Sequence, residues 1–221
     1  MLRQRFETEL KRLEQEVLDL GRVVHRAVTR SVEALVARDL VSAAQIVAQD
    51  VQINAKRFQI ESDTLALIAT QQPMARDLRS LATILDVIRE LERTGDYAKG
   101  ISKINLSIGD QELIKPLLDI PRMATLAMTM LDQALMAYVN HDEQAAREIP
   151  LRDVQVDQLY DQIRRELMSL ILADRSKIEQ ANMLLWAAHN LERAADRVTN
   201  ICERIVFLAT GELADLPDGR D

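Results

Sequence analysis

The stretch Leu91-Glu-Arg-Thr-Gly-Asp96 returns 100 positions later as Leu191-Glu-Arg-Ala-Ala-Asp196. Upstream of it, Asp50-Val-Gln52 returns as Asp153-Val-Gln155 on a shift of 103. Matches at a nearly constant spacing indicate an internal duplication. The change of shift predicts a deletion of three residues in the turn between these segments of the second half.

The composition and the spacing of apolar residues both favour helices. The chain has 221 residues, of which 48% are hydrophobic, and it contains only six Gly and five Pro. Apolar or small residues recur at alternating steps of four and three from Phe6 to about Ala37, which is typical of a long amphipathic helix. Similar patterns run from Asp39 to the turn at Gln71-Gln-Pro73, and from there to about Ile108. We therefore predict an all-α protein.

The duplication predicts two similar halves. Pro116 and Pro121 interrupt the helical pattern near the middle of the chain. We expect one three-helix repeat over residues 1–109, a second over residues 116–210, and a loose acidic tail over residues 211–221. The six long helices would form two pseudo-symmetric three-helix bundles, similar in form to spectrin repeats.

Three residues predict local features of these helices. Asp39 and Asp142 hold equivalent positions just before a helix, where an aspartate side chain caps the first free amides. Pro150 falls inside the fifth predicted helix, so a kink is expected there.

The charge and the cysteine content exclude several classes of protein. A net charge of −7, with the arginines interleaved among acids, argues against a nucleic-acid partner. The single Cys202 fits a reducing compartment. The first ten residues contain no apolar signal segment, and no stretch is long and apolar enough to cross a membrane. We therefore expect a cytoplasmic protein that meets membranes only through partners.

Each half carries two pairs of oxygen-bearing residues spaced four apart, so that each pair lies on one helix face. The pairs are Asp50 with Asn54 and Glu92 with Asp96 in the first half, and Asp153 with Asp157 and Glu192 with Asp196 in the second. In an antiparallel hairpin, two residues lie side by side when they are equally far from the turn. In each half the two pairs are equally far from the predicted turn, which is at Pro73 in the first half and at Ala173-Asp-Arg175 in the second. Four side chains then lie close together in each half. At a rise of about 1.5 Å per residue, each group is roughly 27 to 36 Å from the tip of its hairpin.

Asp50 lies in the apolar stripe of its helix, where an uncompensated carboxylate is costly. The compensation could come from protein cations, and Arg57, Arg93 and Arg193 are near the motifs in sequence. It could also come from a metal, since clustered carboxylates suit hard cations such as Mg²⁺, Mn²⁺ or iron. The residues alone leave both interpretations open.

Catalysis has little support in the sequence, and we predict no catalytic residues. Only three His occur, and the Glu-x-x-His motif of di-iron oxidases is absent. His189 precedes Glu192 by three residues and is expected to be an inter-helix or surface residue rather than a ligand. A metal-dependent hydrolase or oxidase using the carboxylate clusters is the enzymatic alternative. A helical structural dimer without metal is a third.

The two Leu-Glu-Arg-x-x-Asp segments, together with Asp50-Val-Gln-Ile-Asn54, Asp153-Val-Gln-Val-Asp157 and the turn Pro73-Met-Ala-Arg-Asp-Leu-Arg79, resemble the motifs of the PhoU family of phosphate-signalling regulators. The resemblance covers nearly the whole chain. It implies two three-helix bundles, a tendency to form homodimers, and metal ions such as Mg, Mn, Fe or Zn bound by the eight paired residues named above.

The resemblance also implies a function. The chain would be a non-enzymatic negative regulator of phosphate uptake and of phosphate-starvation signalling. Its partners would be the ATPase subunit of a phosphate ABC importer and a sensor histidine kinase. The sequence departs from the family in its first half, where Gly100 replaces the family's Asn, retained as Asn200, and where Asn54 is neutral. The first site is therefore expected to bind metal more weakly than the second, or not at all.

Overall fold

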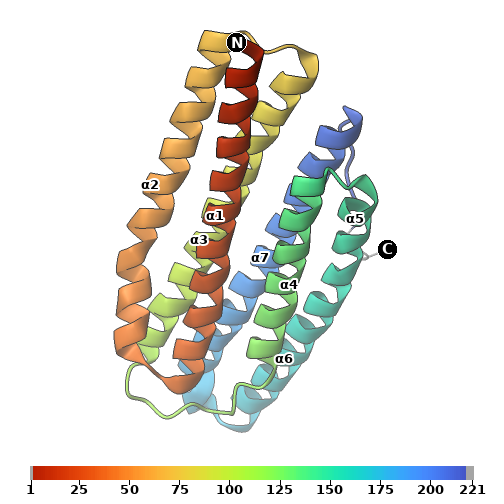
Figure 1. Cartoon of the computed structure of the whole chain (residues 1–221). Helices are drawn as coiled ribbons and strands as arrows, with labels where there is room; N and C mark the ends of the chain where they lie inside the picture. The colour runs from red at the N-terminus through yellow and green to blue at the C-terminus, as the bar shows by residue number, and fades with distance from the viewer. Residues whose placement is uncertain (1, 218–221) are drawn as a thin grey trace.

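The computed structural model describes residues 2–217, and every regular element in that range is a helix (Figure 1). The first half contains three long helices, α1 (Leu2–Ala37), α2 (Leu40–Gln71) and α3 (Ala75–Ile108). The second half contains α4 (Asp119–Asn140), α5 (Glu143–Glu148), η1 (Ile149–Arg152), α6 (Asp153–Ala173), η2 (Arg175–Lys177) and α7 (Ile178–Thr210). The predicted all-α fold is confirmed, and the predicted helix ends near Ala37, Gln71 and Ile108 agree with the structure.

Both predicted caps are present. Asp39 Oδ1 accepts a hydrogen bond from the Ser42 amide at 2.9 Å, and Asp142 Oδ1 accepts one from the Ala145 amide at 3.0 Å. Each aspartate therefore satisfies a backbone donor that has no partner within its helix. The equivalent geometry in the two halves supports the duplication inferred from sequence.

Pro150 interrupts the fifth predicted helix as expected. The helix is divided into α5 and α6 by the 3₁₀ segment η1, and Pro150 lies at the start of that segment. A proline has no amide hydrogen to donate, and its ring collides with the preceding turn. A short change of helical winding accommodates both effects.

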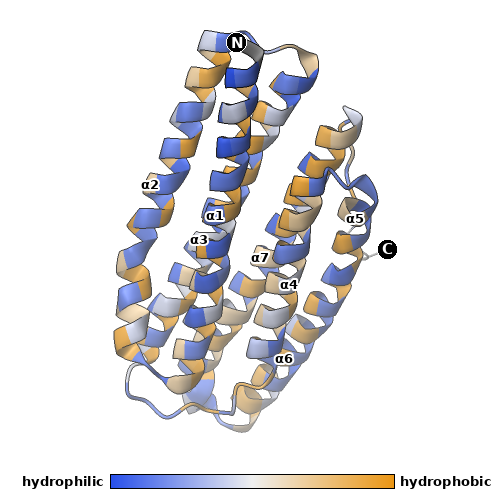
Figure 2. Cartoon of the chain, viewed as in Figure 1, coloured by the Kyte–Doolittle hydropathy of each residue, from blue (hydrophilic) through white to orange (hydrophobic). Residues whose placement is uncertain are grey.

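The two halves lie side by side (Figure 1), with α3 packed on α7 and α1 packed on α4. Hydrophobic and hydrophilic residues alternate along each helix (Figure 2), so each helix turns an apolar stripe inward. On α1 this stripe includes Leu13, Val17 and Leu20, whose side chains are fully buried. One hydrophobic core runs through both halves.

The chain beyond α7 folds back along the molecule in its described part. Leu216 is buried, and its amide donates a hydrogen bond to Glu203 Oε1 at 3.2 Å. The segment expected to be a loose tail is therefore attached at this point, while residues 218–221 lie outside the described residues. Within residues 2–217, no helix has the length and apolarity that a membrane crossing requires.

The Asp39 cap should contribute to stability in a pH-dependent way. Hydrogen bonds from the Ser42 hydroxyl and amide lower the pKa of Asp39 below its ordinary value of 3.8. The contribution is therefore present above that value and is lost as the pH falls through the lower, folded-state pKa. We expect Asp39→Ala to lower the midpoint of urea unfolding at pH 7, while Asp39→Asn, which keeps an acceptor, retains most of it. The difference between wild type and Asp39→Ala should narrow below pH 3.8, and a constant difference would contradict the prediction.

Candidate functional site

The first hairpin closes in the predicted register. Gly95 lies so close to α2 that a Cβ atom placed on it would be 3.0 Å from Ile53 Cδ1. Asp50, three residues before Ile53, is within electrostatic range of Glu92 and Asp96, which lie three residues before and one residue after Gly95. The structure therefore brings the first predicted set of residues to the same level of the hairpin.

Asp50 is the most buried member of the first set, with 6% of the residue exposed. Its Oδ2 atom accepts hydrogen bonds from Lys99 Nζ at 2.6 Å and from Asn54 Nδ2 at 3.2 Å. Lys99 Nζ also lies 3.8 Å from Asp96 Oδ1. The cation that compensates Asp50 is thus a lysine one turn beyond the Glu92-x-x-x-Asp96 motif.

The carboxylates of the first set repel one another. Desolvation raises the pKa of Glu92, and the nearby charges of Asp96 and Asp50 raise it further. Desolvation and the charge of Asp50 likewise raise the pKa of Asp96. The hydrogen bond to Asp50 raises the pKa of Lys99, so the lysine stays charged. The ammonium group therefore relieves part of the repulsion within the cluster.

More positive charge lies around the first set. A hollow of about 220 Å³ opens beside Asp50, and Arg26 and Arg30 of α1 are among the residues that line it. Arg57, on α2, is close enough to lower the pKa of Glu92 and forms an ion pair with Glu61.

The second hairpin also closes in the predicted register. Tyr160 on α6 and His189 on α7 have ring centroids 6.1 Å apart. Their midpoint in the sequence is the same as that of the pairs of acidic residues, so their contact reports the predicted register. Because the helices are antiparallel, Asp157 and Asp153 follow on α6 at the levels of Glu192 and Asp196 on α7. Asp153 is fully buried, as its counterpart Asp50 nearly is.

Two polar contacts involve carboxylates of the second set. His189 Nδ1 lies 3.2 Å from Glu192 Oε2, and Arg193 Nη1 forms an ion pair with Asp196 Oδ2 at 3.1 Å. His189 also contacts the ring of Trp186 edge-on, with centroids 5.6 Å apart. These contacts lie within α7, and it is the ring contact with Tyr160 on α6 that agrees with the expectation of an inter-helix or surface residue.

The two sets differ in charge at three equivalent positions. On the shifts of 103 and 100 that relate the halves, Asn54 corresponds to Asp157, Arg57 to Tyr160, and Lys99 to Thr199. The second set therefore has one more carboxylate than the first and lacks the two cations that accompany it. Sequence reasoning missed Lys99, although its position three residues after Asp96, and the Thr at the matching position of the other half, mark it as a candidate partner.

Metal binding by these residues remains a prediction. Within residues 2–217, no group of three or more His, Cys, Asp or Glu is already gathered so that it could hold a metal ion. By donor chemistry the second set fits a hard cation, because it offers four carboxylates at one level of a hairpin. The first set does not fit well, because the Lys99 ammonium already lies against Asp50 and Asp96.

The departure at Gly100 has a structural explanation. A Cβ atom on Gly100 would lie 3.1 Å from the side-chain amide of Asn190, so α3 and α7 approach closely there. At the equivalent position of the other half, Asn200 donates a hydrogen bond to Glu90 at 3.0 Å, and Arg197 forms an ion pair with the same carboxylate at 3.2 Å. The two halves thus use different residues at equivalent places in their common interface.

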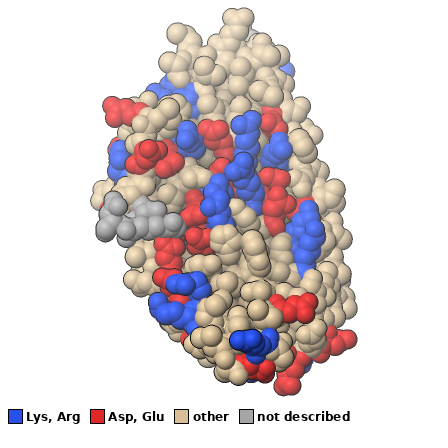
Figure 3. Space-filling view, turned by 180° about the vertical axis from the view of Figure 1, so that it is seen from behind, with Lys and Arg blue, Asp and Glu red and all other residues tan. Residues whose placement is uncertain are grey.

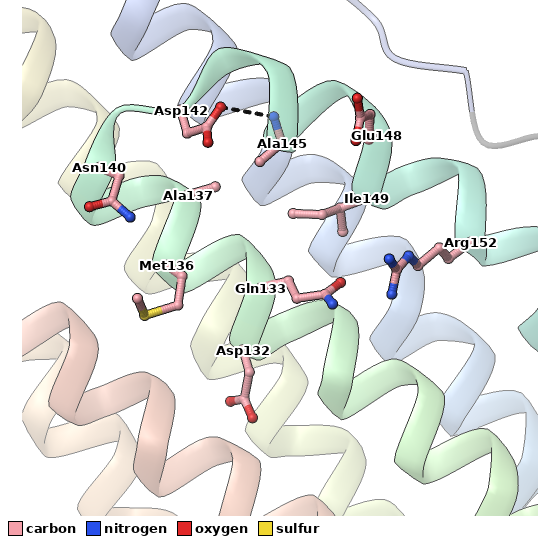
Figure 4. Close-up of a pocket in the computed structure, with 10 residues that line it drawn as sticks. All are labelled: Asp132, Gln133, Met136, Ala137, Asn140, Asp142, Ala145, Glu148, Ile149 and Arg152. Carbon is pink, nitrogen blue, oxygen red and sulfur yellow. Dashed lines mark hydrogen bonds between the residues drawn. The ribbon is translucent and has the colours of Figure 1, made fainter.

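Two further hollows lie away from the acidic sets. On the face seen from behind, Lys and Arg side chains gather beside Asp and Glu (Figure 3). A hollow of about 420 Å³ there has Arg89, Arg93 and Arg204 among its lining residues. A second hollow, also of about 420 Å³, is bordered by α4, α5 and η1, with Gln133 and Arg152 pointing toward it (Figure 4).

Removal of Lys99 tests its role in the first set. We expect Lys99→Met to destabilise the fold by about 2 kcal/mol, because it leaves the buried Asp50 carboxylate beside two other acids without their cation. This value is below that for a fully buried pair, since part of the lysine side chain reaches solvent. Urea unfolding at pH 7 measures the loss.

Lys103→Met is the matched control, because Lys103 is exposed one turn farther along the same helix. It should cost less than about 0.5 kcal/mol. Equal losses of unfolding free energy in the two variants would show that the ion pair with Lys99 does not stabilise the buried Asp50 carboxylate.

Comparisons with known proteins agree with the duplicated architecture. The PhoU domain model of protein families matches residues 17–104 and again residues 120–205. A protein named phosphate-specific transport system accessory protein PhoU homolog from Streptococcus pneumoniae is 35% identical over 215 residues, 97% of this chain and 100% of its own length. The homolog of the same name from Clostridium acetobutylicum is 35% identical over 219 residues, 99% of this chain and 100% of its own.

Two crystal structures show the same fold. One is of the phosphate transport system regulatory protein PhoU from Streptococcus pneumoniae, with a TM-score of 0.88, 34% identity, and coverage of 96% of this chain and 100% of the other. The other is of PhoU from Pseudomonas aeruginosa, with a TM-score of 0.88, 28% identity, and coverage of 94% and 100%. Each likeness extends over both halves.

Proposed function

The chain belongs to the PhoU family, and from that premise we propose that it is a regulatory adaptor of phosphate homeostasis that restrains phosphate uptake and phosphate-starvation signalling. The observation that carries the proposal is the full-length match, across both repeats, to proteins named as accessory or regulatory components of phosphate transport. Those names describe regulators and not enzymes, which supports a role without turnover.

The partners in this proposal are the ATPase subunit of a phosphate ABC importer and a sensor histidine kinase. Both present cytoplasmic domains, so the adaptor acts in the cytoplasm and reaches the membrane only through them. A bundle of long helices supports this role, because it presents several extended faces at fixed relative positions (Figure 1). The adaptor works as a homodimer.

The second acidic set is the metal site in this proposal. Asp153, Asp157, Glu192 and Asp196 hold a cation such as Mg, Mn, Fe or Zn, and the metal supplies positive charge that draws α6 and α7 together at this level. The first set, with Asp50, Asn54, Glu92 and Asp96, binds metal weakly because Lys99 provides part of the charge that a metal would bring. The difference in charge at the three equivalent positions supports this assignment.

Deletion of the gene tests the regulatory role. In the source organism we expect the deletion strain to take up phosphate in excess when phosphate is ample and to express phosphate-starvation genes constitutively. Uptake of radiolabelled phosphate and a starvation-promoter reporter measure the two effects, and the intact gene supplied in trans should reverse both. A deletion strain with normal responses would contradict the assignment.

Elemental analysis of matched variants tests the metal proposal. We expect protein purified without chelator to carry metal, and Glu192→Ala/Asp196→Ala to lose most of it. Glu92→Ala/Asp96→Ala is the matched control, because it removes the repeat-equivalent residues from the set that contains the Lys99 ion pair, and it should retain at least two thirds of the metal. Equal metal in all three samples would leave the metal outside both sets.

A further inference from the structure

The solvent face of α2 carries an apolar stripe with the spacing of a coiled-coil seam. The stripe advances by alternating steps of three and four, and it comprises Val41, Ala44, Ala48, Val51, Ala55, Phe58, Ser62, Leu65 and Ala69. All nine are exposed, and Ser62 is the one polar member. The two largest side chains near its centre, Val51 and Phe58, are 66% and 58% exposed. A helix in contact with solvent on this side would ordinarily place charged residues there.

This stripe lies opposite the face that α2 buries in its own bundle. The buried face has its own regular spacing, with Ile46, Ile53, Ile60 and Leu67 seven residues apart. Within the described part of the chain, α2 packs against α1 and α3 alone. It forms the outer edge of the first half, on the side away from α4–α7 (Figure 1).

The second half provides an internal control for this feature. On the shift of 103, Ala55, Phe58 and Ser62 at the centre of the stripe correspond to Gln158, Asp161 and Arg165 on α6. These three residues are exposed as well. The fold therefore tolerates an ordinary polar surface at this place, and the apolar stripe is specific to α2.

The residues beside the stripe carry little charge. Gln45, Gln52 and Gln59 follow one side of it and are exposed and neutral. The acid on the other side is Glu61, which is held in ion pairs by Arg57 and Arg89. A second copy of a chain with a net charge of −7 can approach here without opposing free charges.

The order of small and large residues along the stripe fits a copy of itself. If two α2 helices pack antiparallel about a two-fold axis between residues 56 and 57, Leu65 lies opposite Ala48 of the partner subunit and Phe58 lies opposite its Ala55. In the same arrangement Val51 lies opposite Ser62. Each of these three large residues thus meets a small one, which keeps the helices evenly spaced. A parallel pair would set Phe58 against Phe58 and Ala55 against Ala55, and its layers would be uneven.

We propose that the exposed stripe of α2 is the interface of an isologous dimer, in which α2 packs antiparallel against α2 of a second copy of this chain. In this register the self-paired seam runs from Ala44 to Ala69, which is 26 residues or about 39 Å of helix. The inference specifies the surface used by the homodimer in the proposed function, and it rests on that function only for the existence of the dimer.

Sedimentation velocity over a series of concentrations tests the interface. We expect the wild-type chain of 25.1 kDa to be a dimer at micromolar concentration, and Phe58→Glu to weaken dimerisation at least 100-fold. Leu172→Glu is the matched control, because Leu172 is 86% exposed at the position on α6 that corresponds to Ala69. It should change the dissociation constant less than threefold. Circular dichroism shows whether each variant keeps its helices.

A size swap tests the register. Ala55→Phe alone sets two phenylalanines against each other and should weaken the dimer at least tenfold. Adding Phe58→Ala restores a large residue opposite a small one and should bring the dissociation constant back to within threefold of wild type. Failure of the double variant to recover, while Phe58→Glu still breaks the dimer, would overturn the antiparallel register.

The outcomes separate this surface from the dimer itself. A wild-type chain that stays monomeric at 100 µM would overturn both. A dimer that survives Phe58→Glu would overturn the α2 surface and leave the proposed homodimer standing. A monomer that binds vesicles or a kinase fragment through Phe58 would show that another occupant covers the stripe, and would overturn the proposal.

Discussion

The antiparallel register of the two long hairpins is the constraint on which the other features depend. A hairpin of helices more than 20 residues long has one register that buries both apolar stripes, because a slip of one residue rotates a helix by about 100°. Once α2 lies against α3 with Ile53 beside Gly95, Asp50 must lie near Glu92 and Asp96. The acidic cluster is thus a consequence of hydrophobic packing, and the chain has to compensate its charge.

The two halves solve this shared electrostatic problem differently. In the first, Lys99 lies against Asp50, and Arg57 lies near Glu92, so the protein itself balances part of the charge. In the second, tyrosine and threonine stand at the equivalent positions and an extra carboxylate is present. The duplicated hairpin therefore accepts two different distributions of charge at the same place in the fold.

The faces of the molecule are as distinct as its two acidic sets. The outer side of α2 is apolar and almost uncharged, whereas the side seen in Figure 3 combines arginines with acids over α3 and α7. Because α3 and α7 also form the contact between the halves, that charged side spans both repeats. The long helices hold these distinct surfaces at fixed distances from one another.

The sequence by itself determined the helices, their caps, the duplication and the hairpin register. Helix periodicity, the Asp39 and Asp142 caps and the break at Pro150 depend on nearby residues, so their signals are local. The register followed from the symmetric placement of the acidic pairs about Pro73 and Asp174. The tertiary structure alone decided that Lys99, and not one of the arginines first considered, neutralises Asp50, and that Gly100 gives Asn190 its space.

The tertiary structure also decided which of two apolar stripes on α2 faces the core. Both stripes have the periodicity of a buried helix face, so the pattern cannot tell which one is covered. Contacts with α1 and α3 bury the stripe of Ile46, Ile53 and Ile60 and leave the stripe of Val51 and Phe58 in solvent. Such choices depend on residues distant in sequence, because only the assembled bundle places them together.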